Sequence, residues 1–316
     1  MVWWILGCTL RPGGVPEPEV VDAPVREGRQ AERVIAVGKG PDALFHDAAR
    51  ARVLVANVED SHVSVIATST RSVAASIPIA KGPWGFVSLS SDRVAVTSWE
   101  RALSIIDLST DTVEKAFSLP FNAGGLAVSA DGGSAWVVSP TEDAVVSISL
   151  TDGAEISRFN TGKGPDGIAR IADRLVVGHT KDGTIGIYDL DGNRVGLLSP
   201  GGKPELVHPS HDGRFALVSN FDLGRVHIVD PAAGSMVREL VDVEGAEDTW
   251  ERVDPARYLV ASFQTERVLT FDADGVRKGP VYLTGAKPIG VLATSTELWV
   301  SNYGDNSVSV FELASP

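Results

Sequence analysis

Seven segments of this 316-residue chain share one pattern, and their spacing of about 40 residues constrains the fold more than any other feature. Each segment has a Gly/Pro turn, a strand, a second strand ending in a small or polar residue, an Asp-containing turn and a third strand. Such a period, with β-branched runs between turns, is typical of a four-stranded propeller blade. The second strands are expected at Val53–Asn57, Val94–Ser98, Ala135–Ser139, Leu175–His179, Ala216–Asn220, Leu259–Phe263 and Leu298–Asn302.

The two ends of the repeat region predict how the ring closes. The first six units carry a fourth strand, for example Thr112–Leu119 or Val276–Leu283, but the seventh ends with its third strand at Ser307–Leu313. Arg33–Val37 reads as a strand with no blade of its own, so we expect it to complete the last blade and cover its open edge. The predicted fold is therefore all-β: one seven-bladed β-propeller of four-stranded blades, the last closed by the N-terminal strand. Helices are expected to be absent or trivial.

The N-terminal 30 residues do not share the repeat. Residues 1–8 are an apolar run ending at Cys8 and resemble a truncated signal segment with a lipobox, in which Cys8 would be the lipidated residue. The alternative is an apolar N-terminus without that meaning. Residues 9–30 are rich in Pro, Glu and Gly, and they predict a disordered tether ahead of a propeller at residues 31–316. This arrangement predicts an extracytoplasmic (periplasmic or cell-surface) protein attached to the membrane only through its lipid.

Several repeats resemble a known family. Gly38–Pro41, Gly162–Pro165 and Gly285–Gly290 resemble the turn that opens each repeat of YVTN-repeat β-propellers, and Val300–Val310 resembles the family's most diagnostic stretch. The resemblance covers residues 33–313, although units three and six lack the Pro. It implies a relationship to the YncE-like group, whose members are typically bacterial or archaeal extracytoplasmic and surface proteins without assigned chemistry. It therefore implies the fold strongly and the function weakly.

Charge and cysteine content exclude several classes of protein. Acidic residues number 41 and basic residues 28, so the formal net charge is −13. Nucleic-acid binding depends on Lys and Arg neutralising phosphates, and adsorption to anionic lipid also requires positive charge. A single cysteine excludes an intrachain disulfide framework and cysteine-cluster metal sites. We therefore expect no nucleic-acid partner, and a monomer.

Three local motifs have both a chemical and a structural interpretation. Gly38–Gly40 and Gly162–Gly164 could cradle phosphate, but their recurrence before Pro favours blade-linking turns. Asp189–Asn193 and Asp272–Gly275 resemble fragments of calcium loops, but they lie where a tight hairpin is expected and lack a downstream Glu. His208 and His211 could ligate a metal if carboxylates joined them. Trp84, Trp136, Trp250 and Trp299 are expected to pack between blades.

One group of acids exceeds what chance would give. The residue after each linking turn should lie near the mouth of the central channel, and aligning the units places Asp42, Asp166, Glu205 and Asp248 there, with Trp84, Gly124 and Ile289 in the other three blades. Carboxylates gathered in a ring repel one another, so a cation is favoured among them. The hypothesis is a rim site for Ca²⁺, another divalent cation or a cationic ligand. The alternative is a solvated rim without a ligand.

These observations favour a binding function. No sequence motif for nucleophilic, haem or phosphate chemistry occurs, and no catalytic residue is assigned. We expect a non-catalytic scaffold that binds a protein or small ligand through the channel mouth. The alternative is a metal-dependent, lactonase-like hydrolase, or a dehydrogenase-associated propeller, that uses the acidic rim. No cofactor is certain.

Overall fold

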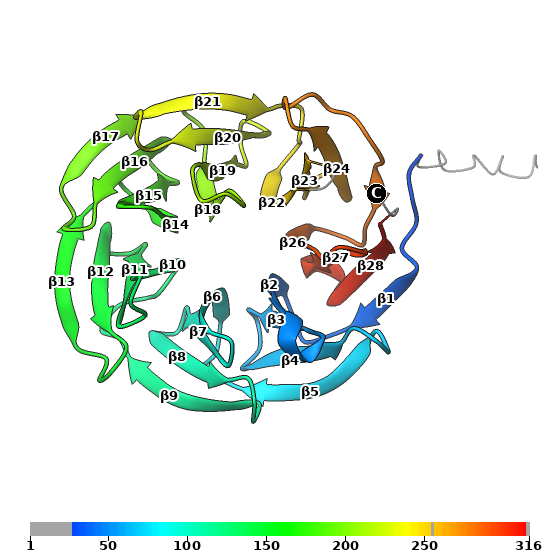
Figure 1. Ribbon diagram of the computed structural model, residues 1–316, viewed down its shortest axis with the longest axis horizontal. Helices are drawn as coiled ribbons and strands as arrows, with labels where there is room; N and C mark the ends of the chain where they lie inside the picture. The colour runs from blue at the N-terminus through cyan, green and yellow to red at the C-terminus, as the bar shows by residue number, and fades with distance from the viewer. Residues whose placement is uncertain (1–26, 254–255, 314–316) are drawn as a thin grey trace, which may run out of the picture.

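Seven four-stranded antiparallel sheets form a closed ring in the computed structural model, which describes residues 27–253 and 256–313 (Figure 1). Each sheet is one blade, with its strands following one another outward from the central channel. The ring confirms the predicted all-β seven-bladed propeller. Cys8 and the lipobox-like segment lie outside the described residues.

Every blade presents one strand to the channel and one to the periphery. The innermost strands are β2 (Pro41–Asp47), β6 (Pro83–Ser90), β10 (Leu126–Val128), β14 (Pro165–Ile171), β18 (Pro204–Pro209), β22 (Ala246–Val253) and β26 (Pro288–Ala293). The second strands are β3 (Arg52–Asn57), β7 (Arg93–Ser98), β11 (Ser134–Ser139), β15 (Arg174–His179), β19 (Ala216–Asn220), β23 (Ala256–Ser262) and β27 (Glu297–Asn302). The third strands are β4 (His62–Ala67), β8 (Ala102–Asp107), β12 (Ala144–Ser149), β16 (Thr184–Asp189), β20 (Arg225–Asp230), β24 (Arg267–Asp272) and β28 (Ser307–Glu312). The outer strands are β5 (Ser72–Pro78), β9 (Thr112–Ser118), β13 (Glu155–Asn160), β17 (Arg194–Leu198), β21 (Ser235–Leu240), β25 (Tyr282–Leu283) and β1 (Arg33–Ala36).

Helical structure in the described residues is confined to two short 3₁₀ turns, η1 (Ala48–Arg50) and η2 (Tyr303–Asp305). No helix among these residues has the length and apolar character needed to cross a membrane.

The N-terminal strand closes the ring as predicted. β1 pairs with β28 in antiparallel register, with Ile35 opposite Val308 and only 5% exposed. The chain also reaches the neighbouring blade before β1 begins, because Arg29 N–H donates to Val281 O and Leu283 N–H donates to Arg29 O. This pairing supports β25, the fourth strand of the sixth blade, which is much shorter than the predicted Val276–Leu283. Residues 29–36 therefore contact the last two blades, and the hydrogen bonds of Arg29 fall within the last residues of the predicted tether.

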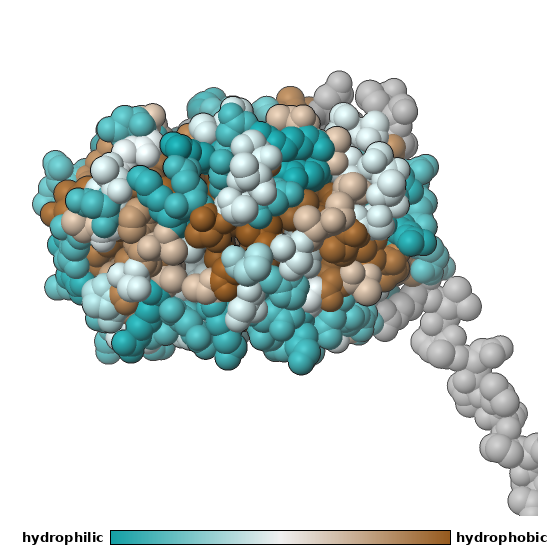
Figure 2. Space-filling view, turned by 90° about the horizontal axis from the view of Figure 1, so that it is seen from below, coloured by the Kyte–Doolittle hydropathy of each residue, from teal (hydrophilic) through white to brown (hydrophobic). Residues whose placement is uncertain are grey.

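Apolar side chains fill the spaces between blades. Leu54 and Val65 of the first blade, for instance, join Val94, Val96 and Ile106 of the second in one buried cluster. Alternation along each strand supplies these contacts, because successive side chains point to opposite faces of a sheet and each face packs on a neighbouring blade. Figure 2, which views the ring from its edge, shows hydrophobic residues along the middle of the flank between more hydrophilic margins.

Two of the four predicted packing tryptophans are fully confirmed. Trp136 and Trp299 are buried. Trp250 is partly buried and packs against two of the core clusters. Trp84 differs, because it lines the central cavity instead of the space between blades. Its position matters for the site described below.

The sixth blade corrects the alignment of the repeats by one residue. Ala246 pairs with Ser262, as Pro41 pairs with Asn57 and Pro204 with Asn220. The second strand of this blade therefore ends at Ser262 and not at Phe263. The predicted offset arose because Ala246 replaces the Pro that marks the register in other blades.

The aspartates before the third strands fasten the linking turns. Asp60 Oδ2 accepts the N–H of Lys39 at 2.6 Å, and Asp182 Oδ2 accepts that of Lys163 at 2.7 Å. Asp143 of the preceding blade accepts the N–H of Gly164 at 2.8 Å. The donors that a phosphate would need are thus already used, which supports the turn interpretation of Gly38–Gly40 and Gly162–Gly164. The two calcium-loop fragments are likewise hairpin turns: Asp189 and Asp272 accept N–H groups of their own turns.

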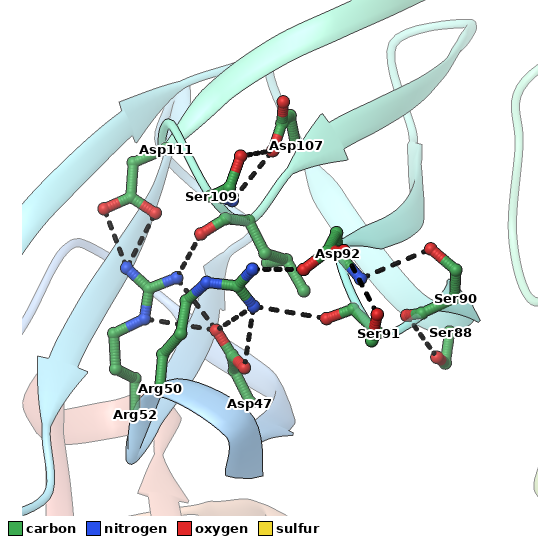
Figure 3. Close-up of polar contacts among 11 residues, drawn as sticks. Asp47, Arg50, Arg52, Ser88, Ser90, Ser91, Asp92, Asp107, Ser109 and Asp111 are labelled. Atoms are coloured by element: carbon green, nitrogen blue, oxygen red, sulfur yellow. Dashed lines mark hydrogen bonds and ion pairs between the residues drawn. The ribbon is translucent and has the colours of Figure 1, made fainter.

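An arginine network joins the first two blades at the end of β2 away from the linking turns (Figure 3). Arg52 donates twice to Asp111, at 2.8 Å each, and once to the carbonyl oxygen of Leu108. It also bonds the buried carboxylate of Asp47 at 2.8 Å, which Arg50 contacts as well. Two fork-shaped guanidinium groups thereby satisfy a buried charge and fix the angle between neighbouring blades.

Candidate functional site

Four carboxylates occupy the same position at the mouth of the channel, directly after the first residue of the inner strand. Three of them, Asp42, Asp166 and Glu205, were predicted. In the sixth blade the equivalent residue is Glu247, because Ala246 takes the place of the Pro. Asp248, the residue predicted there, lies one position further along β22 but still faces the cluster, since its charge acts on Asp42. The structure therefore brings all four predicted acids together and adds a fifth.

The backbones of neighbouring inner strands approach one another closely, and this fixes the positions of the acids. A Cβ at Gly167 would collide with the carbonyl oxygen of Glu205 in the next blade, and a Cβ at Gly290 would collide with that of Asp42. Ser301 Oγ accepts the N–H of Gly290 at 2.7 Å and donates to the carbonyl oxygen of Asp42 at 2.5 Å. Glycine is required at these two positions because any side chain would push neighbouring inner strands apart. The acids are consequently held by the frame of the ring.

Asp42 is the least compensated of the acids. It is 8% exposed and lines the central cavity, and its carboxylate accepts no hydrogen bond from any described residue. Burial is the main reason that its pKa rises to about 8, and the neighbouring charges of Asp248 and Asp166 add to the effect. Burial and Glu205 raise the pKa of Asp166 to about 7, against a smaller opposing effect of Lys203. Near neutral pH the cluster therefore holds protons that ordinary carboxyl groups would have released.

Glu247 is likewise a buried acid without a hydrogen-bond donor to its carboxylate in the described part of the chain. It is 8% exposed, and among the described residues no donor reaches its carboxylate. Burial raises its pKa well above the usual value, and repulsion from Glu205 and Asp42 raises it further. A cation placed between Asp42 and Glu247 would relieve both.

One cation of the chain already binds in the cluster. Lys203 Nζ donates to Glu205 Oε1 at 2.7 Å and lies 5.4 Å from the centre of the Phe221 ring. The other oxygen of Glu205, Oε2, is buried without a partner. Burial alone would lower the pKa of Lys203, but Glu205 and the more distant Asp166 outweigh it, and the net shift is upward. Three of the acids, Glu205, Asp166 and Glu247, thus share this one ammonium group.

His208 compensates a single acid. Its Nε2 lies 2.9 Å from Asp248 Oδ1, and the N–H groups of Val291 and Thr249 also donate to Asp248. Burial would raise the pKa of Asp248, but His208 and the two N–H groups lower it overall. The pKa of His208 is raised in return, because Asp248 outweighs burial. Asp248 is thus a satisfied anion, in contrast to Asp42.

Beneath the acids the channel holds a cavity of about 590 Å³. Asp42, Asp248 and Trp84 line the cavity beside the cluster. Further along the inner strands its walls carry polar residues, including Ser88 and Arg170, and one apolar side chain from each of five neighbouring blades in the same register: Leu44, Phe86, Leu126, Ile168 and Val207. The volume falls within the range of small-molecule sites.

Aromatic rings flank the acids. The residue after the second strand is aromatic in four of seven blades, and all four face the linking-turn side: Trp99, Phe221, Phe263 and Tyr303. Trp84 lies 6.2 Å from Trp99, and Phe221 lies 5.6 Å from Phe263. Tyr303 is close enough to Asp42 for its pKa to respond to that charge, although its hydrogen bond to Glu59 is the main cause of a rise to about 12.

Sequence reasoning missed Glu247, Lys203 and the aromatic residues after the second strands, and it considered His208 only as a metal ligand. Because acids stand at both 247 and 248, the sequence did not show which of them aligns with Asp42. Lys203 was not considered because it lies before the aligned position. The aromatic residues carried a usable signal, because they recur at one position of the repeat.

The predicted metal site can be compared with the geometry. Among the residues that the structure describes, no three His, Cys, Asp or Glu side chains are grouped closely enough to hold a metal ion. His208 and His211 do not form a pair toward a common ligand: His208 contacts Asp248, and His211 is exposed and donates its backbone N–H to Glu251. The arrangement suits a cation that needs charge and ring faces better than one that needs a tight oxygen shell.

Comparison with known proteins gives the fold. No family model matches the chain, and no curated protein matches it. Hydrazine synthase of Kuenenia stuttgartiensis superposes with a TM-score of 0.76 at 16% identity, over 88% of this chain and 96% of that chain. The β-propeller domain of Cps50 (Swd1) from Myceliophteria thermophila superposes with a TM-score of 0.75 at 12% identity, over 90% and 100% of the respective chains. Likeness at these identities shows a shared propeller fold.

Proposed function

We propose that this chain is a non-catalytic binding scaffold that takes a cationic ligand at the acidic mouth of its channel. One observation carries the proposal: Asp42 is only 8% exposed, it faces the central cavity, and its carboxylate has no hydrogen-bond donor among the described residues. An unpaired buried carboxylate is costly to keep in a folded protein, so such a group marks a place where a ligand supplies the missing partner. Glu247 supports the proposal in the same way.

The alternative of a metal-dependent, lactonase-like or dehydrogenase-associated enzyme receives less support. It requires a metal held by the rim, and the described residues form no such group. We therefore favour an organic cation over Ca²⁺ or another divalent ion as the ligand.

The setting that we propose is extracytoplasmic. The resemblance to YVTN-repeat, YncE-like propellers and the lipobox-like Cys8 support a location outside the cytoplasm, with Cys8 as a lipid anchor. Mass spectrometry of the mature N-terminus after cell fractionation tests this part, and an unmodified Met1 in the cytosolic fraction would overturn it.

Calorimetric titration with butylammonium chloride at pH 8.5 tests the binding proposal. Wild-type protein is expected to bind, and Asp42→Asn to bind about tenfold more weakly, because a charge-assisted contact contributes about 1.5 kcal/mol. Asp173→Asn is the matched control: it makes the same change in charge, but Asp173 lies in the turn between β14 and β15, at the far end of β14 from Asp166. Equal affinities for all three proteins, or tighter binding of Ca²⁺ than of butylammonium, would contradict the proposal.

A further inference from the structure

The cavity beneath the acids limits what kind of cation can be the ligand. It is continuous with Asp42 and Trp84 at the mouth, and it extends along the inner strands past Leu44, Phe86 and Ile168. A small ion bound at Asp42 would leave these apolar walls in contact with water. A ligand with an apolar body would cover them, which contributes about 25 cal/mol for each Å² removed from water.

The chain itself shows which cation the mouth accepts. Lys203 is a primary ammonium on an alkyl stem, and it is held by one carboxylate and one aromatic ring, Glu205 and Phe221. The first and second blades offer the same two kinds of group on the cavity wall: the carboxylate of Asp42 and the indole of Trp84. Indole is the most favourable ring for contact with a cation. This part of the mouth therefore offers the same two kinds of group, a carboxylate and an aromatic ring, that hold the alkylammonium of Lys203.

We infer that the ligand is an amphiphilic organic ammonium, with its charged group between Asp42 and Trp84 and its apolar body in the channel. The inference rests on the proposed function and narrows it from cations in general to monocations with an apolar body that fits about 590 Å³. Charge complementarity selects the head, and the apolar walls select the body. A fatty acid with its carboxylate at the mouth is disfavoured, because that group would join the acids there.

Chain length provides the test. Ethyl-, butyl-, hexyl- and octylammonium chloride are titrated at pH 8.5 into wild-type protein and Asp42→Asn, with octanol and octanoate as the neutral and anionic probes of equal length. Affinity is expected to rise about fourfold for each added CH₂ until the channel is filled, since each buried CH₂ contributes about 0.8 kcal/mol. Asp42→Asn should weaken every ammonium by a similar factor and leave the dependence on length intact.

The outcomes separate the two proposals. Equal affinity of ethyl- and octylammonium would overturn the amphiphilic ligand while leaving cation binding at the mouth. Absence of binding by every ammonium would overturn both. Octanol binding as tightly as octylammonium, or octylammonium binding equally to wild type and Asp42→Asn, would place the interaction on an apolar surface away from the acids and would also overturn the inference.

Discussion

The protein is expected to lose about 2–3 kcal/mol of its free energy of unfolding as the pH rises from 6.5 to 9. The pKa of Asp42 is about 8 and that of Asp166 about 7 in the folded protein, whereas ordinary aspartates titrate near 4. Between these values the folded state binds more protons than the unfolded state, so raising the pH favours unfolding. Glu247, whose pKa is also raised, acts in the same direction.

A buried histidine opposes this loss below about pH 6.5. Burial lowers the pKa of His179 to about 4, and this contribution stabilises the folded protein as the pH rises toward 6.5. Above that pH the histidine is neutral in both states, and the raised carboxyl pKa values dominate the profile. His208, whose pKa is raised, adds to the loss as the pH rises through its folded pKa.

Thermal unfolding between pH 6.5 and 9 measures the effect. The midpoint of wild-type protein should fall by roughly 3–6 °C. Asp42→Asn should flatten the profile and exceed wild type at pH 9, because it removes a charge that burial opposes. Asp173→Asn should run parallel to wild type, since Asp173 is largely exposed. Parallel profiles for wild type and Asp42→Asn would show that Asp42 is not buried unpaired.

Removing residues 1–37 is expected to cost at least about 4 kcal/mol, while removing residues 1–26 costs nothing measurable. The longer truncation deletes β1, exposes the edge of β28, and removes both hydrogen bonds between Arg29 and the sixth blade. It also uncovers the core around Val308 and Val310, which Ile35 closes. An open edge with apolar residues beneath it invites association with other chains.

The two truncations are matched, because the shorter one removes no contact made within the described residues. Unfolding midpoints and elution volumes should therefore be unchanged after removal of residues 1–26 and should fall, with self-association, after removal of residues 1–37. Equal midpoints for the two proteins would contradict the role of β1 in closing the ring.

The fold could be predicted from the sequence because each blade repeats the same local sequence pattern. Turn residues, β-branched runs and alternation recur about every 40 residues, and the unmatched strand at Arg33–Val37 indicated how the ring closes. The predicted strand register was wrong only in a blade that lacks the Pro at the start of its inner strand. Ala246 in place of Pro moved the alignment of the sixth blade by one residue, and Glu247 was passed over for Asp248.

The site could be predicted only in part. The position after the turn identified acids that converge, since ring symmetry brings equivalent positions together. The sequence could not predict which of these acids is paired with a positively charged group. Asp248 is paired with His208, whereas the carboxylate of Asp42 has no such partner among the described residues. That difference depends on which neighbouring strand supplies a donor. The alignment placed Trp84 at the mouth, whereas the expectation that it packs between blades was wrong, because Trp84 lines the cavity.

Proton release on binding tests the central claim most directly. Octylammonium is titrated calorimetrically at pH 7.5 in phosphate and in Tris, two buffers with very different heats of protonation. An alkylammonium keeps its proton at this pH, as lysine does, so released protons can come only from the protein. A cation at the mouth favours the charged carboxylates, and the heats should differ by an amount that corresponds to about 0.5–2 protons per ammonium bound, and to fewer in Asp42→Asn. Equal heats in the two buffers, or unchanged proton release in Asp42→Asn, would contradict cation binding at the acidic mouth.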